Sequence, residues 1–170
     1  PDVVRKNIAI TPSEIQKELV ASLADRAEKV RNKMVDSSVD NMLLITNDGR
    51  KLALDQRLSN DMLPDDPNGK VSTCAENVYE IWDRSTPQKS AQLVFCDLST
   101  PHNDGKFNVY DDIRSKLIAK GIPESEIAFI HSADTEAKKK DLFAKVRAGQ
   151  VRVLIGSTFK MGAGTNVQKR

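Results

Sequence analysis

The feature that most constrains the fold is a short apolar strand signal that runs directly into a glycine-rich segment. Within residues 151–155, Val151, Val153, Leu154 and Ile155 form a short, mostly β-branched apolar set of the kind that a fully buried parallel strand needs. Gly156 ends this run, and a set of hydroxyl, glycine and amide residues follows it: Ser157, Thr158, Gly162, Gly164 and Asn166. Such a set lets the backbone approach a ligand closely and bond phosphate or sugar. The glycines alone are equally compatible with a tight connection in any α/β protein.

Strand and helix signals alternate over residues 70–170. The expected strands are 93–96, 127–130 and 151–155, and the expected helices are 70–82, 111–120 and 134–146. Alternation of this kind implies right-handed crossovers and a parallel sheet with helices on both faces. We therefore predict an α/β domain over residues 70–170.

Residues 1–69 have a helical character and form the other predicted region. Thr11 is the expected cap of a long amphipathic helix that continues to about Lys33, with Pro12 in the first helical position. The segment 47–49, Asn-Asp-Gly, predicts a turn, and 52–58 predicts a short helix. The run Pro-Asp-Asp-Pro-Asn-Gly at 64–69 marks the boundary between the two regions.

Four segments, in order along the chain, resemble the second motor domain of superfamily 2 helicases, and most closely the Swi/Snf-like branch. Residues 157–166, Ser-Thr-Phe-Lys-Met-Gly-Ala-Gly-Thr-Asn, resemble motif V, and residues 92–100 are similar to motif IV. Residues 127–132 are similar to the strand and turn that precede the family's basic helix, and residues 8–19 to the helix that leads in from the first motor domain. The resemblance implies a RecA-like, three-layer domain with a mainly parallel sheet, related to P-loop NTPases, at 70–170, with 1–69 as the helical lead-in.

The sequence departs from the family pattern at three points. Ser132 stands where the family usually has glycine, and Lys139 stands where arginine is commoner, which matters because lysine cannot grip a phosphate in a bidentate way. Neither a Gly-x-x-x-x-Gly-Lys-Ser/Thr loop nor an Asp-Glu box occurs, and motif VI would lie beyond Arg170. We therefore expect a fragment of a large bacterial or mobile-element polypeptide that also carries a DNA methyltransferase.

The function implied by the resemblance is ATP-driven movement on DNA by two motor lobes of one polypeptide. ATP and Mg²⁺ would bind in the parent protein, and the fragment alone would lack ATPase activity and have no catalytic or metal-binding residue of its own. Two residues would face the nucleotide: Gly164 and Asn166. Five would contact the DNA backbone without reading its sequence: Ser157, Thr158, Ser99, Thr100 and Lys139.

Composition indicates a soluble domain and gives little further information on function. The chain has 170 residues and a net charge of +2, which is too small to indicate nucleic-acid binding by itself. No apolar stretch is long enough to span a membrane, so we expect a cytoplasmic protein. Cys74 and Cys96 lack a metal-ligand spacing and are interpreted as reduced packing residues. His131 is interpreted as structural, since no catalytic partner is evident for it.

Three alternatives remain open at this stage. The domain could be a non-catalytic RecA-like scaffold or regulatory part of a larger, methyltransferase-fused protein. It could also be an unrelated flavodoxin-like or phosphatase-like enzyme, although no nucleophile or metal cluster is evident. The lysine triplet 138–140 could be a solvated helix face or a phosphate contact.

Overall fold

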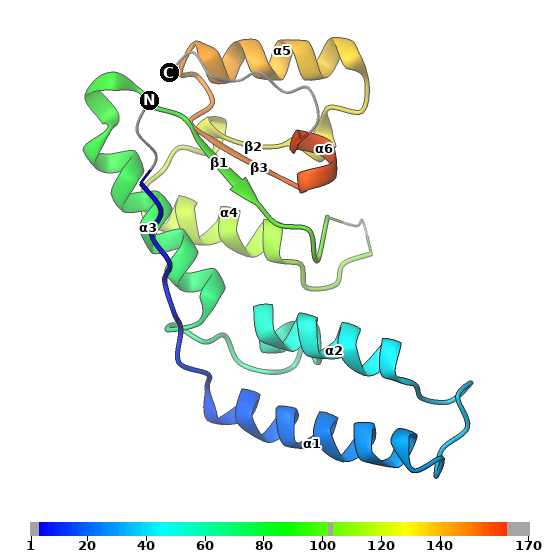
Figure 1. Cartoon of the computed structure of the whole chain (residues 1–170). Coiled ribbons are helices and arrows are strands. Elements are labelled where there is room, and N and C mark those ends of the chain that lie inside the picture. Colours follow the sequence, from blue (N-terminus) through cyan, green and yellow to red (C-terminus); the bar gives the residue numbers. More distant parts are fainter. Residues whose placement is uncertain (1–3, 102–103, 163–170) are drawn as a thin grey trace. The chain divides into compact units, whose positions relative to one another are not determined.

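The structure of the chain is a computed structural model that describes residues 4–101 and 104–162 (Figure 1). The chain divides into two compact units, residues 1–70 and residues 71–170. The first, which we call the helical unit, holds the first two α-helices and a short 3₁₀ helix. The second, which we call the sheet unit, holds the strands and the remaining helices.

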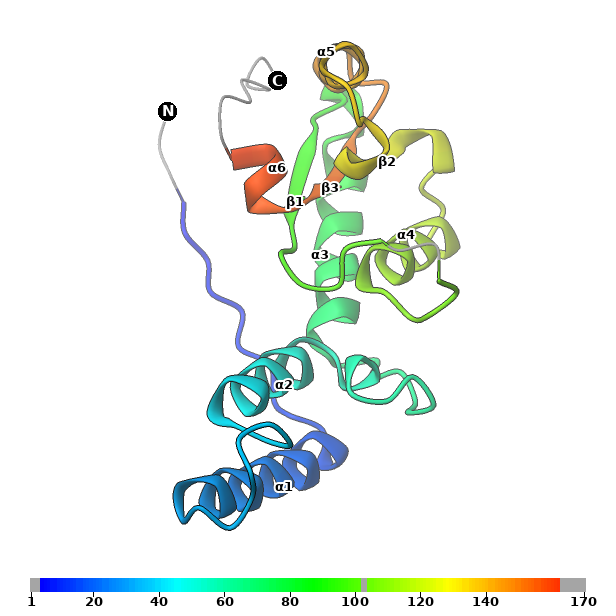
Figure 2. The ribbon, with the colours of Figure 1, turned by 90° about the vertical axis from the view of Figure 1, so that its right-hand side faces the viewer.

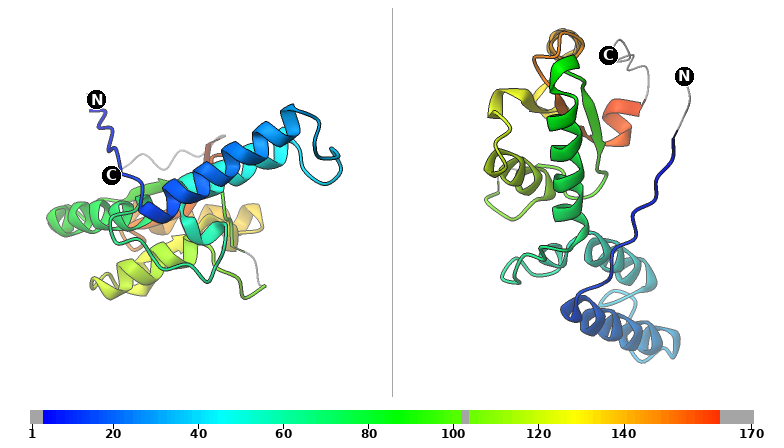
Figure 3. Two further views of the ribbon diagram at one scale, coloured as in Figure 1. Left: turned by 90° about the horizontal axis from the view of Figure 1, so that it is seen from below. Right: turned by 90° about the vertical axis from the view of Figure 1, so that its left-hand side faces the viewer.

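The helical unit is built on two antiparallel helices, α1 (Glu14–Arg31) and α2 (Met42–Leu54), followed by the short 3₁₀ helix η1 (Gln56–Leu58) (Figures 1 and 3). Arg26 of α1 forms ion pairs with Asp48 of α2, at 2.9 Å, and with Asp40, which lies just before α2, at 2.8 Å. These hydrogen-bonded carboxylates raise the pKa of Arg26, so the guanidinium stays charged.

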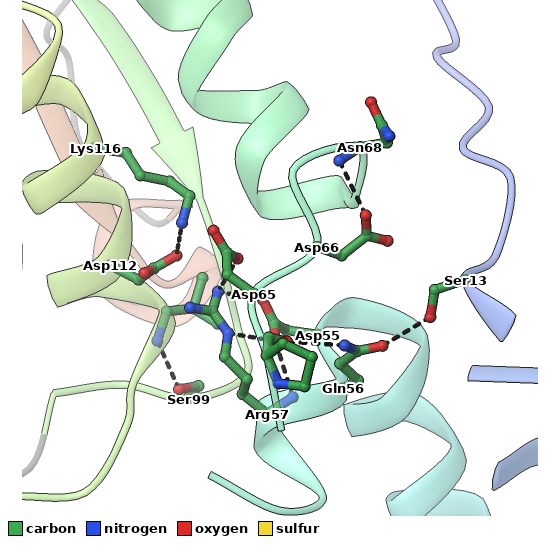
Figure 4. Close-up of polar contacts among 12 residues, drawn as sticks. Ser13, Asp55, Gln56, Arg57, Asp65, Asp66, Asn68, Ser99, Asp112 and Lys116 are labelled. Carbon is green, nitrogen blue, oxygen red and sulfur yellow. Dashed lines mark hydrogen bonds and ion pairs between the residues drawn. The ribbon is translucent and has the colours of Figure 1, made fainter. Parts of the chain in front are cut away.

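The start of α1 lies two residues later than the sequence predicted. Ser13, and not Thr11, is the cap: its hydroxyl accepts from the Gln16 N–H, and the Gln16 side chain accepts from the Ser13 N–H, both at 3.1 Å. The same side chains tie α1 to the segment after it, because the Ser13 hydroxyl donates to Gln56 and the Gln16 amide donates to the Leu52 carbonyl (Figure 4). Tertiary contacts therefore select this capping box over the upstream one.

The turn predicted at residues 47–49 is wrong, because these residues lie inside α2. Ile45 and Leu52 are buried on either side of the segment. A methyl group at Gly49 would lie 3.7 Å from Leu23 of α1, so the glycine stands at the contact between the helices. The predicted short helix at 52–58 is instead the end of α2 followed by η1, where Arg57 forms ion pairs of 2.8 Å with Asp55 and 2.7 Å with Asp65 (Figure 4).

The sheet unit confirms the predicted parallel arrangement of three strands. Its strands are β1 (Gln92–Phe95), β2 (Ile127–Phe129) and β3 (Val153–Gly156), in the order β1-β3-β2, and both pairings are parallel. Its α-helices are α3 (Lys70–Arg84), α4 (Val109–Ala119), α5 (Glu136–Arg147) and α6 (Thr158–Gly162). Its 3₁₀ helices are η2 (Thr86–Gln88), η3 (Glu124–Glu126) and η4 (Ile130–Ser132). This is an α/β fold.

Helices lie on both faces of the sheet, which makes three layers (Figure 2). Leu154 of β3 points to one face, where it packs in a cluster with Val146 of α5 and Met161 of α6. Gln92 of β1 points to the opposite face and donates to the Val78 carbonyl of α3 at 2.9 Å. Alternate residues of the central strand β3 therefore serve two packed faces, as expected for a buried parallel strand, whereas β1 is partly exposed.

A buried arginine joins all three strands at the amino edge of the sheet. Arg152, which precedes β3, is 2% exposed, and its guanidinium lies 4.8 Å from the centre of the Trp82 ring. Its carbonyl accepts from the Gln92 N–H of β1, and its N–H donates to the Glu126 carbonyl before β2, both at 2.8 Å. Its guanidinium donates to four further acceptors: the Trp82 and Ser90 carbonyls and the Ser85 and Thr86 hydroxyls. We call this set the Arg152 network.

Replacing Arg152 with methionine should lower the free energy of unfolding of the sheet unit by about 2–4 kcal/mol, because it leaves buried acceptors without a donor. Urea unfolding followed by fluorescence of Trp82, the single tryptophan, measures this change. Arg84→Met, at an exposed position at the end of α3, is the matched control and should change stability by less than about 0.5 kcal/mol. Equal effects of the two substitutions would contradict the role given to the network.

Two glycine substitutions should have opposite effects. At Gly156 a methyl group would lie 2.5 Å from Ile130 Cγ2 and 2.7 Å from Met161 Sδ, so Gly156→Ala should cost about 1–3 kcal/mol. At Gly49 there is room, and alanine favours helix, so Gly49→Ala should stabilise the helical unit by up to about 1 kcal/mol. Thermal unfolding followed by circular dichroism tests both, and a neutral Gly156→Ala would show that α6 is free to shift.

Candidate functional site at the carboxyl edge of the sheet

The loops that follow β1 and β3 leave the sheet side by side. The strands are neighbours, with Phe95 in register with Gly156, and the Cys96 N–H donates to the Gly156 carbonyl at 2.9 Å. Ligands of open α/β sheets bind at this carboxyl edge. The structure therefore brings the hydroxyl residues predicted after β1 and those predicted after β3 to the same edge.

Thr158, the first residue of α6, is held by a carboxylate from the neighbouring loop. Its N–H donates to Asp97 Oδ1 at 2.6 Å, and its hydroxyl donates to Asp97 Oδ2 at 2.9 Å. Both residues are exposed. The sequence interpretation assigned the Thr158 hydroxyl to a DNA phosphate and did not identify Asp97, although an acid directly after a strand at this edge was a usable signal.

Ser157 is buried between β3 and α6 and shapes the start of that helix. Its carbonyl accepts from the N–H groups of Lys160, at 3.1 Å, and Met161, at 2.9 Å, and its hydroxyl accepts from the Lys160 N–H at 3.3 Å. Gly164 and Asn166, which the sequence assigned to the nucleotide, lie outside the residues that the structure describes.

Ser99 and Thr100 lie in the loop between β1 and α4. Ser99 has a positive φ of 59°, and its hydroxyl accepts from the Val109 N–H at 2.9 Å, which anchors the loop to the first turn of α4 (Figure 4). Thr100 follows it and is half-buried. Asn108 caps the same helix by accepting from the Asp111 N–H. The Ser99 contact thus fastens the early part of the loop to the helix that follows it.

Tyr110 fastens the start of this loop, directly after β1. Its ring is fully buried, and its hydroxyl donates to the Cys96 carbonyl at 2.5 Å. The ring contacts Phe129 and His131 edge to face, with ring centroids 5.5 and 5.2 Å apart, so His131 packs against a core aromatic. Burial, with smaller contributions from Cys96 and Asp97, raises the pKa of Tyr110. The sequence interpretation missed this residue, since a tyrosine in an apolar helix pattern gives no sign of a distant partner.

Lys139 lies on α5, where it pairs with an acid of its own helix. Its ammonium lies 2.8 Å from Glu136 Oε1, and that of Lys138 lies 2.8 Å from Asp134 Oδ1. The hydrogen bond from Lys138, and then its charge, hold the pKa of Asp134 below its usual value. Exposed pairs of this kind contribute little to stability and are easily exchanged for other partners.

Both cysteines are free thiols, and burial raises the pKa of each. Cys74 lies on α3, and Cys96, directly after β1, donates to the Leu98 carbonyl at 3.0 Å. Within residues 4–101 and 104–162, no helix is both long and apolar enough to cross a membrane.

Comparisons with protein-family models, with curated proteins and with solved structures gave no match.

The free energy of unfolding should fall at alkaline pH because of Tyr110. Its pKa is raised in the folded state, so the hydrogen-bonded neutral form stabilises the fold fully below the unfolded value near 10, and this contribution is lost as the pH rises from there to the folded pKa. Above pH 10 the wild-type stability should fall by up to about 1.4 kcal/mol per pH unit more steeply than that of Tyr110→Phe. Urea unfolding at pH 9, 10 and 11 tests this, and parallel slopes for the two proteins would contradict it.

Proposed function

We propose that residues 70–170 are the second RecA-like lobe of an ATP-dependent DNA helicase or translocase. In this proposal the lobe contacts the DNA backbone and forms one wall of an ATP site whose other wall is the N-terminal motor lobe of the same polypeptide. The three-layer α/β fold with its parallel sheet is the type of fold that such a lobe requires. The resemblance to motifs IV and V supplies the assignment of activity.

The observation that carries the proposal is the meeting of the two motif loops at one edge of the sheet. The Asp97–Thr158 contact joins the loop after β1 to the start of α6, across 61 residues of sequence. A backbone-binding surface needs several donors close together, because each phosphate contact is individually modest. Ser99 and Thr100 from one loop and Thr158 from the other are the donors that this edge offers, with Ser157 beneath them as the residue that shapes α6.

ATP and Mg²⁺ belong to the parent polypeptide in this proposal. Gly164 and Asn166, which follow α6 in the sequence, are proposed to face the nucleotide, and the phosphate-cradling loop and magnesium ligands would come from the first lobe. This lobe would then respond to ATP through the segment that begins with α6. Because α6 also carries Thr158, nucleotide and DNA would act on adjacent parts of one segment.

A protein-binding scaffold is the second candidate, and one observation favours it. Leu93 and Phe95 of β1 are 41% and 51% exposed, and they point to the same face as their register partners in β3. Phe159 of α6 is 91% exposed. Apolar groups exposed on the strand and helix that flank the site are suited to a protein partner.

Binding of a fluorescein-labelled DNA duplex of about 20 base pairs, followed by anisotropy at about 50 mM NaCl, tests the DNA proposal. Two unrelated sequences should bind with equal affinity, and log K should fall linearly with log salt, by about 0.9 per phosphate contacted. Thr158→Val should weaken binding roughly 3- to 10-fold, because it removes one hydroxyl donor to a phosphate.

Thr46→Val is the matched control, since the Thr46 hydroxyl donates to the Met42 carbonyl within α2. It should leave DNA affinity unchanged. Absence of DNA binding by the folded wild-type chain would reject the DNA role and leave the scaffold candidate. If Thr158→Val lowers thermal stability sharply without changing DNA affinity, the hydroxyl is a structural contact only.

A further inference from the structure

We propose that Asp97 is an intramolecular competitor for the phosphate that Thr158 would bind, so that the site exists in a closed state and an open state. This inference rests on the proposed function, and it names how that same site is regulated. The structure shows the closed state, in which the two carboxylate oxygens of Asp97 accept from the N–H and the hydroxyl of Thr158.

A hydroxyl group has one hydrogen to donate. While the Thr158 hydroxyl donates to Asp97, it cannot donate to a phosphate oxygen. The carboxylate resembles a phosphate in this respect: it presents two anionic oxygens, one at 2.6 Å from the N–H nitrogen and one at 2.9 Å from the hydroxyl oxygen. Asp97 therefore occupies both donors of Thr158 with the same chemistry that a phosphate would use.

Charge adds to this competition. A phosphate that approached Thr158 while Asp97 remained in place would lie close to a second negative charge, which disfavours its binding. Asp97 and Thr158 are both exposed, so water can solvate the carboxylate once it leaves. The closed state is thus one that an anionic ligand can displace.

Opening does not require the whole loop to move. Asp97 lies between two anchored residues: Cys96, whose carbonyl accepts from Tyr110, and Ser99, whose hydroxyl accepts from the Val109 N–H. A change of side-chain rotamer at Asp97 is sufficient to release Thr158 while these contacts persist. The anchors hold the loop in place, and the side chain between them is the part that switches.

Asp97→Asn is the informative substitution. The asparagine carbonyl can still accept from the Thr158 N–H, and its amide can donate to the Thr158 oxygen, which leaves the hydroxyl hydrogen for a phosphate. In the duplex-binding assay described above, Asp97→Asn should bind about 5- to 10-fold more tightly than wild type, with a melting temperature within a few degrees. The gain should disappear in the double variant Asp97→Asn, Thr158→Val.

Asp104→Asn is the matched control, because it removes one negative charge from the same loop at a residue that accepts from the Lys106 N–H. It should change affinity by less than 2-fold. Equal gains from the two substitutions would show a general charge effect and overturn the inference, as would weaker binding by Asp97→Asn or a gain that persists without the Thr158 hydroxyl. If the wild type binds DNA and Asp97→Asn binds it equally, the inference fails and the proposed function stands. If neither binds at low salt, both fail.

Discussion

The sheet unit depends on one buried cation. Arg152 lies where the three strands begin, and its backbone and guanidinium together contact α3, the segment before β1 and the segment before β2. An ionised group in the interior is very costly unless its donors are paired, and here the guanidinium meets carbonyls, hydroxyls, an aromatic face and, at 3.8 Å, the Glu126 carboxylate. The paired geometry needs all of these segments in place, so the network ties the starts of the strands to α3.

The Arg152 network stabilises the amino edge of the sheet, so the residues at the carboxyl edge are not needed for that purpose and can serve in binding. At this second edge, hydrogen bonds join the loop after β1 to the helices around it. The Tyr110 hydroxyl donates to the Cys96 carbonyl, the Ser99 hydroxyl accepts from the first residue of α4, and Asp97 accepts from Thr158. Gly156 keeps α6 close to β3, because any side chain there would meet Ile130 and Met161. The candidate site therefore lies on loops that are fastened to the sheet and its helices, as is common for binding residues.

The sequence predicted the strands of this fold well and the details of the helical unit less well. The apolar, β-branched run before Gly156 could only be a buried strand or a buried helix segment, and its shortness and flanking glycine decided for strand. The turn expected at 47–49 failed because Asn-Asp-Gly is a local signal, whereas Ile45 and Leu52 are buried on α2 and Gly49 lies at the contact with α1. Ser13 replaced Thr11 as cap for the same reason, since its partners Gln16 and Gln56 also serve tertiary contacts.

The candidate site was also only partly predictable. The ends of the strands located its hydroxyl residues, but the contacts between distant residues became known only from the folded structure. Ser99, Thr100, Ser157 and Thr158 could be placed at one edge because parallel strands end there, but the partner of Thr158 lies 61 residues away and no periodic pattern connects the two. The polar residues at the two edges of the sheet differ in burial, and this difference decides which of them can change partners. Arg152 is 2% exposed and cannot leave its partners without a large penalty. Asp97 and Thr158 are exposed, so the Asp97 carboxylate can be solvated by water and the Thr158 donors can bind water or an anion instead. A change of state in this unit is therefore expected at the carboxyl edge, while the amino edge keeps the sheet intact.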